Sequence, residues 1–293
     1  MPVTITATAT SAATGAFARA VDAAQQCLDA ASLEPSGLHM LVHVGLYRED
    51  NVVEPALAAL VQEAIGMRPD YLLTRDPFTG FSFDLMNGDC GFLTAVQIAQ
   101  AFLAPGGPQN MLVVAADGHP SGRPHPGFPY AEAGSAALLT LSDSDSGGGF
   151  GRVTLDSDRG QPVQRRGYLD LATMGTEGRR TVTIEQDLDV PALTSRAVDA
   201  AAARLREGGA DPDRTLLITS LPTPRFGIDI AEGLGLPETA AVTLDGVDAD
   251  PRTSALPLAY HRAAGTGRLE AYDTVLFVAA DAGSTIATAL YTL

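Results

Sequence analysis

Asp89 and Cys90 stand directly before a segment with the apolar spacing of a helix, from Gly91 to Leu103. A helix N-terminus favours negative charge by about 0.3 to 1 kcal/mol, so a carboxylate or a thiolate is stabilised at this point. An ionised Asp89 is a weak nucleophile but can act as a base. Cys90 is the nucleophile if the chemistry is covalent. Each also has a structural interpretation, Asp89 as a helix N-cap and Cys90 as a small buried side chain.

Further polar candidates lie in the second half of the chain and in one loop. Ser220 follows an apolar strand, where its hydroxyl either orients a carbonyl or a water or bonds to the backbone. Asp250 lies in a turn-like segment; if it faces Asp89, repulsion raises one of the two pKa values, as in acid/base pairs. His119 and His125 occupy a proline-rich loop that could enter the site. The sequence contains no HxH or HExxH motif, so we expect neither a metal nor a cofactor.

Composition excludes several functions. The 293 residues carry 19 Lys+Arg against 35 Asp+Glu, a formal net charge of -16 at pH 7 that repels nucleic acids. Every cation is arginine, and the absence of lysine excludes Schiff-base and P-loop chemistry. Two cysteines are too few for a disulfide framework or a structural zinc site. We expect a cytoplasmic protein, because the sequence shows neither a signal-peptide pattern nor an apolar run approaching roughly 20 residues.

The elements that position these residues alternate between helix and strand. Apolar residues at helical spacing predict helices over residues 15–33, 54–65 and 91–103. Continuous apolar runs predict strands over residues 38–46 and 111–116. Strands that are apolar on both faces indicate a sheet covered by helices on both sides.

Three sequence echoes indicate an internal duplication. They keep their order and are RAVDAA at 19–24 and 196–201, MLVVAADG at 111–118 with VLFVAAD at 275–281, and AALLTL at 136–141 with TALYTL at 288–293. We therefore predict an α/β fold with two similar halves, residues 1–165 and 166–293. The glycine-rich run at 142–149 lies between two strands rather than between a strand and a helix, which indicates a hairpin loop and not a phosphate loop.

These features resemble the thiolase superfamily, and within it the ketoacyl-ACP synthase III branch of the condensing enzymes. The segments that carry the resemblance are 84–92, similar to the family's nucleophile segment, and 112–117, 131–137, 234–237, 255–259 and 278–290, similar to later landmarks. The resemblance implies a thiolase-like fold, with two pseudo-duplicated halves in a layered α-β-α-β-α arrangement. It begins near residue 16, so we expect the family's N-terminal strand to be largely missing.

The family's catalytic residues are a Cys, a His and an Asn. Matched to this sequence through the surrounding motifs, the Cys falls on Asp89, the His on Ser220 and the Asn on Asp250. Cys90 takes the adjacent small-residue position, and Gly283 is the one glycine left of three in the family's final hairpin. All three catalytic positions therefore differ from the family pattern.

The resemblance implies an enzyme of fatty acid, polyketide or specialised-metabolite biosynthesis that acts on acyl thioesters. With Asp89 as base, we expect acyl transfer, hydrolysis or cyclisation without a cysteinyl intermediate. Decarboxylation of a malonyl thioester is disfavoured, because two carboxylates would oppose an anionic substrate. One alternative is a silent subunit that pairs with an active homologue, and another is a Cys90-dependent acyltransferase.

The resemblance also suggests partners. We expect an acyl-CoA or an acyl carrier protein as substrate, and a homodimer or a heterodimer with a ketosynthase homologue. In the family, the loop that corresponds to the one with His119 and His125 runs near the dimer contact and the tunnel mouth, so these two residues and Gly283 are candidates for substrate binding.

Overall fold

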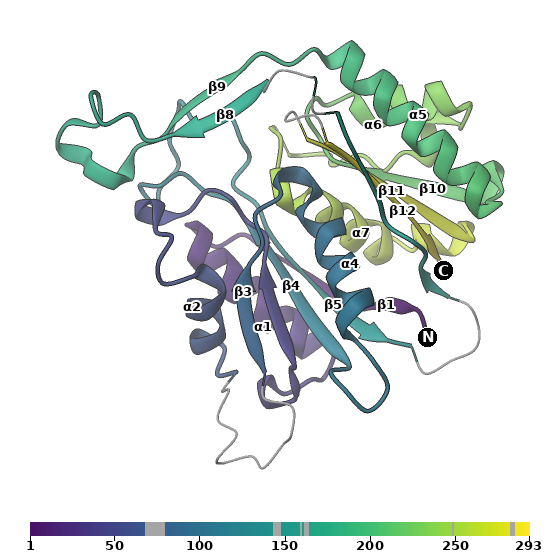
Figure 1. Ribbon diagram of the computed structural model, residues 1–293, viewed down its shortest axis with the longest axis horizontal. Coiled ribbons are helices and arrows are strands. Elements are labelled where there is room, and N and C mark those ends of the chain that lie inside the picture. Colours follow the sequence, from purple (N-terminus) through teal and green to yellow (C-terminus); the bar gives the residue numbers. More distant parts are fainter. Residues whose placement is uncertain (68–79, 143–147, 159, 161–163, 248, 282–284) are drawn as a thin grey trace.

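Most strands of the protein belong to one continuous sheet (Figure 1). The structure, a computed structural model, describes residues 1–67, 80–142, 148–158, 160, 164–247, 249–281 and 285–293. In that part of the chain, the strand order is β10-β11-β12-β6-β1-β5-β4-β2-β3, with β7 also paired to β12, and β8 and β9 form a separate sheet. The strands are β1 (Val3–Ser11), β2 (Met40–His43), β3 (Phe81–Asp84), β4 (Asn110–Ala116), β5 (Gly134–Leu141), β6 (Gly149–Phe150), β7 (Thr154–Ser157), β8 (Arg165–Tyr168), β9 (Thr183–Gln186), β10 (Thr215–Thr219), β11 (Thr274–Asp281) and β12 (Thr285–Thr292).

Strand direction repeats from one end of the sheet to the other. β2 is parallel to β4, β4 is antiparallel to β5, and β5 is antiparallel to β1. In the same way, β10 is parallel to β11, β11 is antiparallel to β12, and β12 is antiparallel to β7. The predicted duplication is therefore confirmed in the strand topology. The boundary at residue 165 stays a prediction, and β7 lies before it although it pairs with the second half.

The helices repeat in the same order. They are α1 (Ala16–Ala30), α2 (Leu57–Ala64), α4 (Gly91–Phe102), α5 (Val190–Gly208), α6 (Phe226–Leu234) and α7 (Ala255–Gly265). Both α1 and α5 precede the first strand of a parallel pair, and both α4 and α7 precede the second. Right-handed crossovers of this kind place helices on both faces of a sheet.

Three clusters of buried hydrophobic side chains define the layers. One packs α1 and α2 against the first half of the sheet, and another packs α5 and α6 against the second half. The largest lies between the two halves, around α4 and α7, which Figure 1 shows between the strands. The predicted layered α-β-α-β-α arrangement is therefore confirmed, and the two central helices bring the sequence-predicted site residues at their N-termini to one place.

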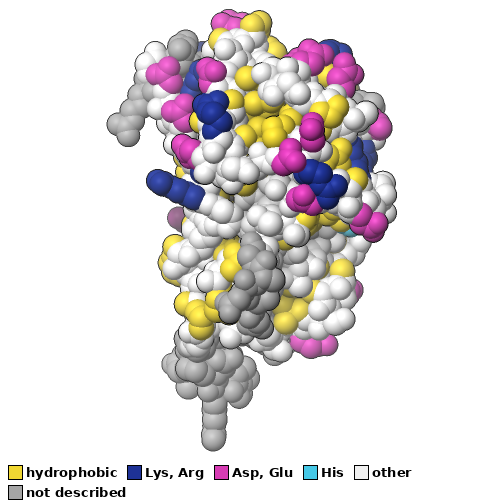
Figure 2. All heavy atoms as spheres, turned by 90° about the vertical axis from the view of Figure 1, so that its right-hand side faces the viewer, with side chains coloured by type: hydrophobic (Ala, Val, Ile, Leu, Met, Phe, Trp, Pro, Cys, Tyr) yellow, Lys and Arg dark blue, Asp and Glu magenta, His cyan; other side chains and the backbone are white. Residues whose placement is uncertain are grey.

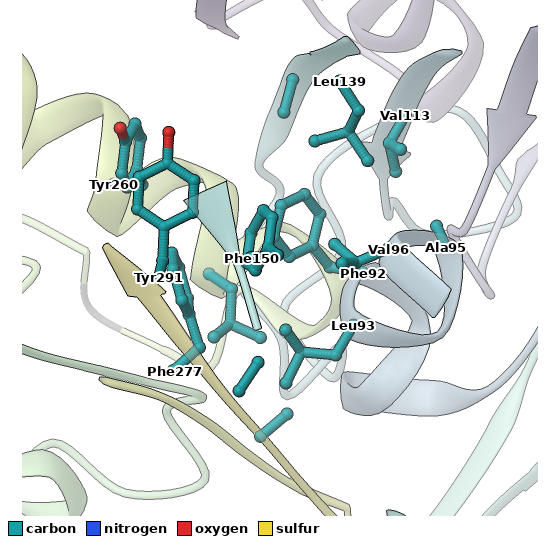
Figure 3. Close-up of a cluster of buried hydrophobic side chains, with 14 of the residues drawn as sticks. Phe92, Leu93, Ala95, Val96, Val113, Leu139, Phe150, Tyr260, Phe277 and Tyr291 are labelled. Atoms are coloured by element: carbon teal, nitrogen blue, oxygen red, sulfur yellow. The ribbon is translucent and has the colours of Figure 1, made fainter. Parts of the chain in front are cut away.

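Aromatic rings hold the central layer together (Figure 3). Phe92 of α4 lies 6.2 Å between ring centroids from Phe277 of β11, and Phe150 of β6 lies 5.5 Å from the same ring. Tyr291 of β12 meets Phe150 edge-on at 4.8 Å. Because truncating such a buried aromatic residue to alanine costs about 3 to 5 kcal/mol, this layer fixes α4 firmly against the second half.

The expectation that the N-terminal strand is missing is wrong. β1 pairs antiparallel with β5 over almost its whole length, from Val3 opposite Leu141 to Ser11 opposite Gly134. Its sequence, VTITATATS, alternates threonine with small or apolar residues and has little of the hydrophobicity by which we located the other strands. The β-branched threonines suit a pleated strand, and the pairing with β5 supplies the burial that the sequence does not reveal.

On the face at the right of Figure 1, most acidic side chains and arginines lie in the upper half of the view, among hydrophobic side chains (Figure 2). The described part of the chain contains no helix long and apolar enough to span a bilayer.

Candidate active site

Asp89 lies in a short 3-10 turn, Gly88–Cys90, that leads directly into α4. Its side chain has no exposed surface. Two guanidinium groups hold it: Nη1 of Arg165 is 3.2 Å from Oδ2, and Nη1 of Arg252 is 3.1 Å from Oδ1. Neither the turn nor α4 has a side-chain cap at its N-terminus. The carboxylate therefore serves ion pairs and not helix capping.

Asp250 joins the same cluster, as the sequence predicts. Its Oδ2 lies 3.1 Å from Nη2 of Arg165, so one guanidinium bridges the carboxylates of Asp89 and Asp250. The other oxygen, Oδ1, accepts a hydrogen bond of 2.8 Å from the backbone N–H of Arg252. The structure thus brings the two predicted carboxylates together across the interface between the halves.

The two arginines at the centre of the site are absent from the sequence-based list. Arg165 is on β8, and Arg252 begins the 3-10 turn before α7. Both guanidinium groups lie over the ring of Tyr130, 5.4 and 5.0 Å from its centroid. These cations weaken the argument that the site repels an anionic substrate, because that argument counted only carboxylates.

Burial and charge shift the pKa values of the carboxyl groups. Burial raises the pKa of Asp89 to about 7, with Arg252 opposing the rise and Asp281 and Asp117 adding to it. The pKa of Asp250 is also raised, first by burial and then by the charge of Asp89. Because the two groups are coupled through one guanidinium, the site retains a proton to higher pH than separate carboxylates would.

The pKa of Arg252 is raised too, which in a cation favours the charged form. Burial alone lowers the pKa of Arg252, but the charges of Asp89 and Asp281 more than offset it and raise that pKa. Arg252 therefore stays charged at every physiological pH. The cluster combines permanently charged donors with two carboxyl groups whose pKa values are raised, that of Asp89 to about 7, which is the pattern of an acid/base site.

Two cavities approach this cluster. One, of about 310 Å³, is lined by Leu46, Tyr47, Gly88, Arg165, Arg166, Gly167, Arg252 and Asp281. The other, of about 220 Å³, is lined mainly by prolines and aliphatic residues together with Tyr130, Arg165, Gln186 and Asp250. Asp89 lines neither cavity; the arginines stand between it and the open space.

Ser220 and Cys90 are placed among backbone groups. The hydroxyl of Ser220 donates to the carbonyl of Ala280 at 3.3 Å and accepts from the N–H of Ala280 at 2.9 Å. The thiol of Cys90 lies 3.7 Å from the carbonyl oxygen of Ala279 and 3.6 Å from that of Thr285. Burial raises the pKa of the Cys90 thiol well above its ordinary value. A thiol in this state is a poor nucleophile, since the thiolate is the reactive form.

His119 and His125 stack on each other, with ring centroids 4.2 Å apart. His119 also meets Phe128 edge-on, and Phe128 in turn meets Tyr130, whose ring lies beneath the two arginines. The contacts that lead from the histidines to the carboxylates therefore pass through two aromatic rings and then the arginines.

The third substrate-binding candidate, Gly283, lies outside the described residues. Within the described residues, no group of three or more His, Cys, Asp or Glu is arranged to hold a metal ion.

The layered duplicated fold, with the site at the N-termini of the two central helices, is a thiolase-like fold similar to that of ketoacyl-ACP synthase III. Curated proteins named β-ketoacyl-[acyl-carrier-protein] synthase III are similar to most of the chain. The protein from Paramagnetospirillum magneticum is 27% identical over 293 residues, covering 92% of this chain and 82% of its own length. The one from Chelativorans sp. is 24% identical over 288 residues, covering 90% and 80%.

Solved structures agree on the fold. Synthase III from Pseudomonas aeruginosa covers 100% of this chain and 98% of its own, with a TM-score of 0.79 and 18% identity. A variant of OleA from Xanthomonas campestris covers 100% and 99%, with a TM-score of 0.79 and 14% identity. No protein-family model matches the sequence. The resemblance seen in the sequence is therefore confirmed, while the altered catalytic positions stay a prediction.

Proposed function

We propose that the protein is an acyl-thioester enzyme of the ketoacyl-ACP synthase III type that uses Asp89 as its acid/base group and forms no cysteinyl intermediate. The observation that carries this proposal is the position of Asp89, at the N-terminus of α4 and ion-paired with Arg165 and Arg252 beside two cavities. The pKa of the neighbouring Asp250 carboxyl is raised by burial and by the charge of Asp89, so this group holds its proton more tightly than an exposed carboxyl does.

The chemistry open to this group is proton transfer. As a carboxylate, Asp89 removes a proton either from the carbon next to a thioester carbonyl or from an attacking water. Negative charge then develops on the carbonyl oxygen, and Arg252 supplies a fixed cation for it. In hydrolysis, the proton passes from the water to Asp89 and from there to the departing thiolate, which leaves a free acid and a thiol. An acyl-CoA or an acyl carrier protein supplies the thioester in either case.

A covalent route through Cys90 has less support. The Cys90 thiol is buried, lies against backbone carbonyls and has a raised pKa. The motif match in the sequence predicts Asp89, and not Cys90, at the position of the family's nucleophile. A buried ion network is also costly to maintain, since hydrophobic residues of similar volume are often as stable. Retention of four charged groups beside cavities therefore supports a chemical role for them.

The test compares Asp89→Asn with Cys90→Ala. Acyl-CoA substrates of two to eight carbons are incubated in D₂O, and both thiol release and deuterium uptake next to the carbonyl are measured. We expect Asp89→Asn to reduce the active reaction by about 10²- to 10⁴-fold, the usual contribution of a general base. Cys90→Ala should stay within about threefold of the wild type. Equal rates in Asp89→Asn and the wild type would refute the proposal.

A second candidate function is a silent subunit, and one observation favours it. Asp89 has no exposed surface, and both guanidinium groups donate a hydrogen bond to its Oδ2. In this role, the protein forms a heterodimer with an active ketosynthase homologue, whereas the enzyme is expected to form a homodimer. Native mass spectrometry after co-expression with ketosynthase homologues distinguishes the two, because only the silent subunit exchanges its own dimer for the mixed one.

A further inference from the structure

Arg165 is the one residue that lines both cavities at the site. The first, the arginine-rich cavity, contains Arg166 and Arg252 as well. The second, the apolar cavity, is formed mostly by Pro129, Leu221, Pro222, Pro224 and Val247. Arg165 thus borders both a polar and an apolar space, and its guanidinium is also paired with Asp89.

Arg165 enters the site from an element outside the main sheet. It is carried by the β8–β9 hairpin, which is separate from the main sheet. Its side chain is 4% exposed, yet its Nε has no hydrogen-bond partner in the structure. A buried donor without a partner costs about 1 to 3 kcal/mol, so the resting position of this side chain is not its most favourable environment.

Movement of Arg165 would leave neither carboxylate alone. Asp89 keeps its ion pair with Arg252, and Asp250 keeps the backbone N–H of Arg252. The cost of a buried charge without any partner is thereby avoided. The backbone of Arg252, by contrast, is held at the start of α7 by its own hydrogen bond to Asp250.

We propose that Arg165 is a displaceable partition that determines the length of acyl chain the protein binds. The ligand is an acyl thioester whose hydrocarbon chain lies in the apolar cavity and whose polar thiol arm lies in the arginine-rich cavity. Its carbonyl then takes the place of the Arg165 guanidinium beside Asp89. The chemical class of this ligand rests on the proposed function, but the partition itself rests on the two cavities and their shared residue.

The test measures acyl-CoA binding by calorimetry with octanoyl-CoA, long enough to require both cavities, and acetyl-CoA, which fills only the arginine-rich one. We expect Arg165→Ala to bind octanoyl-CoA at least tenfold more tightly than the wild type, with acetyl-CoA changed less than threefold. The matched control is Arg180→Ala, because Arg180 lines neither cavity, its side chain is 62% exposed and it pairs with Asp50. It should change both affinities less than threefold.

An unchanged or weaker affinity of Arg165→Ala for octanoyl-CoA overturns the partition, as do equal changes for both ligands. Should this variant fail to fold, a crystal structure of the wild type with octanoyl-CoA decides: the partition requires that Arg165 leave both carboxylates, and its retention beside both refutes the idea. Asp89→Asn separates this inference from the proposed function. Turnover in that variant refutes the acid/base role alone, whereas equal gains for both ligands in Arg165→Ala refute the partition alone.

Discussion

Gly88 and Arg252 adopt the same left-handed backbone conformation at equivalent places in the two halves, with φ angles of 54° and 52°. Each begins a 3-10 turn that leads directly into a central helix. This conformation is open to glycine but costs other residues of order 1 to 3 kcal/mol. In the second half, the strained residue is Arg252 itself, and its side chain reaches Asp89 from this position.

The conformation of Gly88 leads to a first prediction. Gly88→Ala should lower the free energy of unfolding by about 2 to 4 kcal/mol, because the added Cβ is strained at positive φ and collides with the carboxylate of Asp281. Gly106→Ala is the control, since Gly106 also has a positive φ of 73° but no atom within 4 Å of the added Cβ. Urea denaturation gives the free energy of unfolding of both variants. Equal losses would contradict the prediction, because they would mean that the contact with Asp281 adds no cost.

Removing the charge of Arg252 should be more destabilising than removing a surface charge. In Arg252→Gln, the strained backbone remains but buried Asp89 loses one of its two cations, and we expect a loss of about 3 to 5 kcal/mol. Arg214→Gln removes one partner of an exposed ion pair with Asp273 and should cost far less, because solvent screens exposed pairs. The prediction fails if the two variants melt within a degree of each other.

The raised pKa of Asp89 predicts how stability depends on pH. The folded protein holds this proton up to about pH 7, whereas the unfolded chain releases it near pH 4. Between these values the folded state binds more protons, so the free energy of unfolding falls as pH rises, by up to about 1.4 kcal/mol per unit. Asp89→Asn lacks this contribution. Unfolding of both proteins at pH 5 and pH 7 measures it, and parallel pH profiles would contradict the shift.

The cysteines should be unreactive in the folded protein. Burial raises the pKa of Cys27 to about 12 and that of Cys90 well above its ordinary value. Iodoacetamide at pH 7 should therefore label neither residue until the chain is unfolded in guanidinium. Mass spectrometry of native and denatured samples provides the comparison. Rapid native labelling of Cys90 alone would restore the Cys90-dependent acyltransferase as the leading hypothesis.

Periodicity in the sequence located the elements of the core. A helix predicted over 91–103 is α4, Gly91–Phe102, and a strand predicted over 111–116 is β4, Asn110–Ala116. The strand predicted over 38–46 ends at His43, because the N–H groups of Leu46 and Tyr47 donate to the carboxylate of Asp117. A side chain distant in sequence thus ends the strand, and no local pattern could show it.

The site was predictable only in part, for a similar reason. Asp89 and Asp250 precede helices inside recognisable motifs, so their meeting follows from the fold. Arg165 lies in a polar stretch with no pattern and meets those carboxylates across 76 and 85 residues of chain. Arg252 could have been predicted, since it stands two residues after Asp250 and just before α7. The turn-like sequence of this segment indicated a role for Asp250 alone.

The shortest strand of the main sheet has a consequence for how the molecule unfolds. β6 pairs with β1 at Val3 and with β12 at Tyr291 and Thr292, so two residues join the two halves into a single ladder. Fragments cut at residue 165 would each carry an unprotected strand edge, which invites aggregation. The duplicated halves are therefore no longer separable modules, and the chain should lose its structure in one cooperative transition.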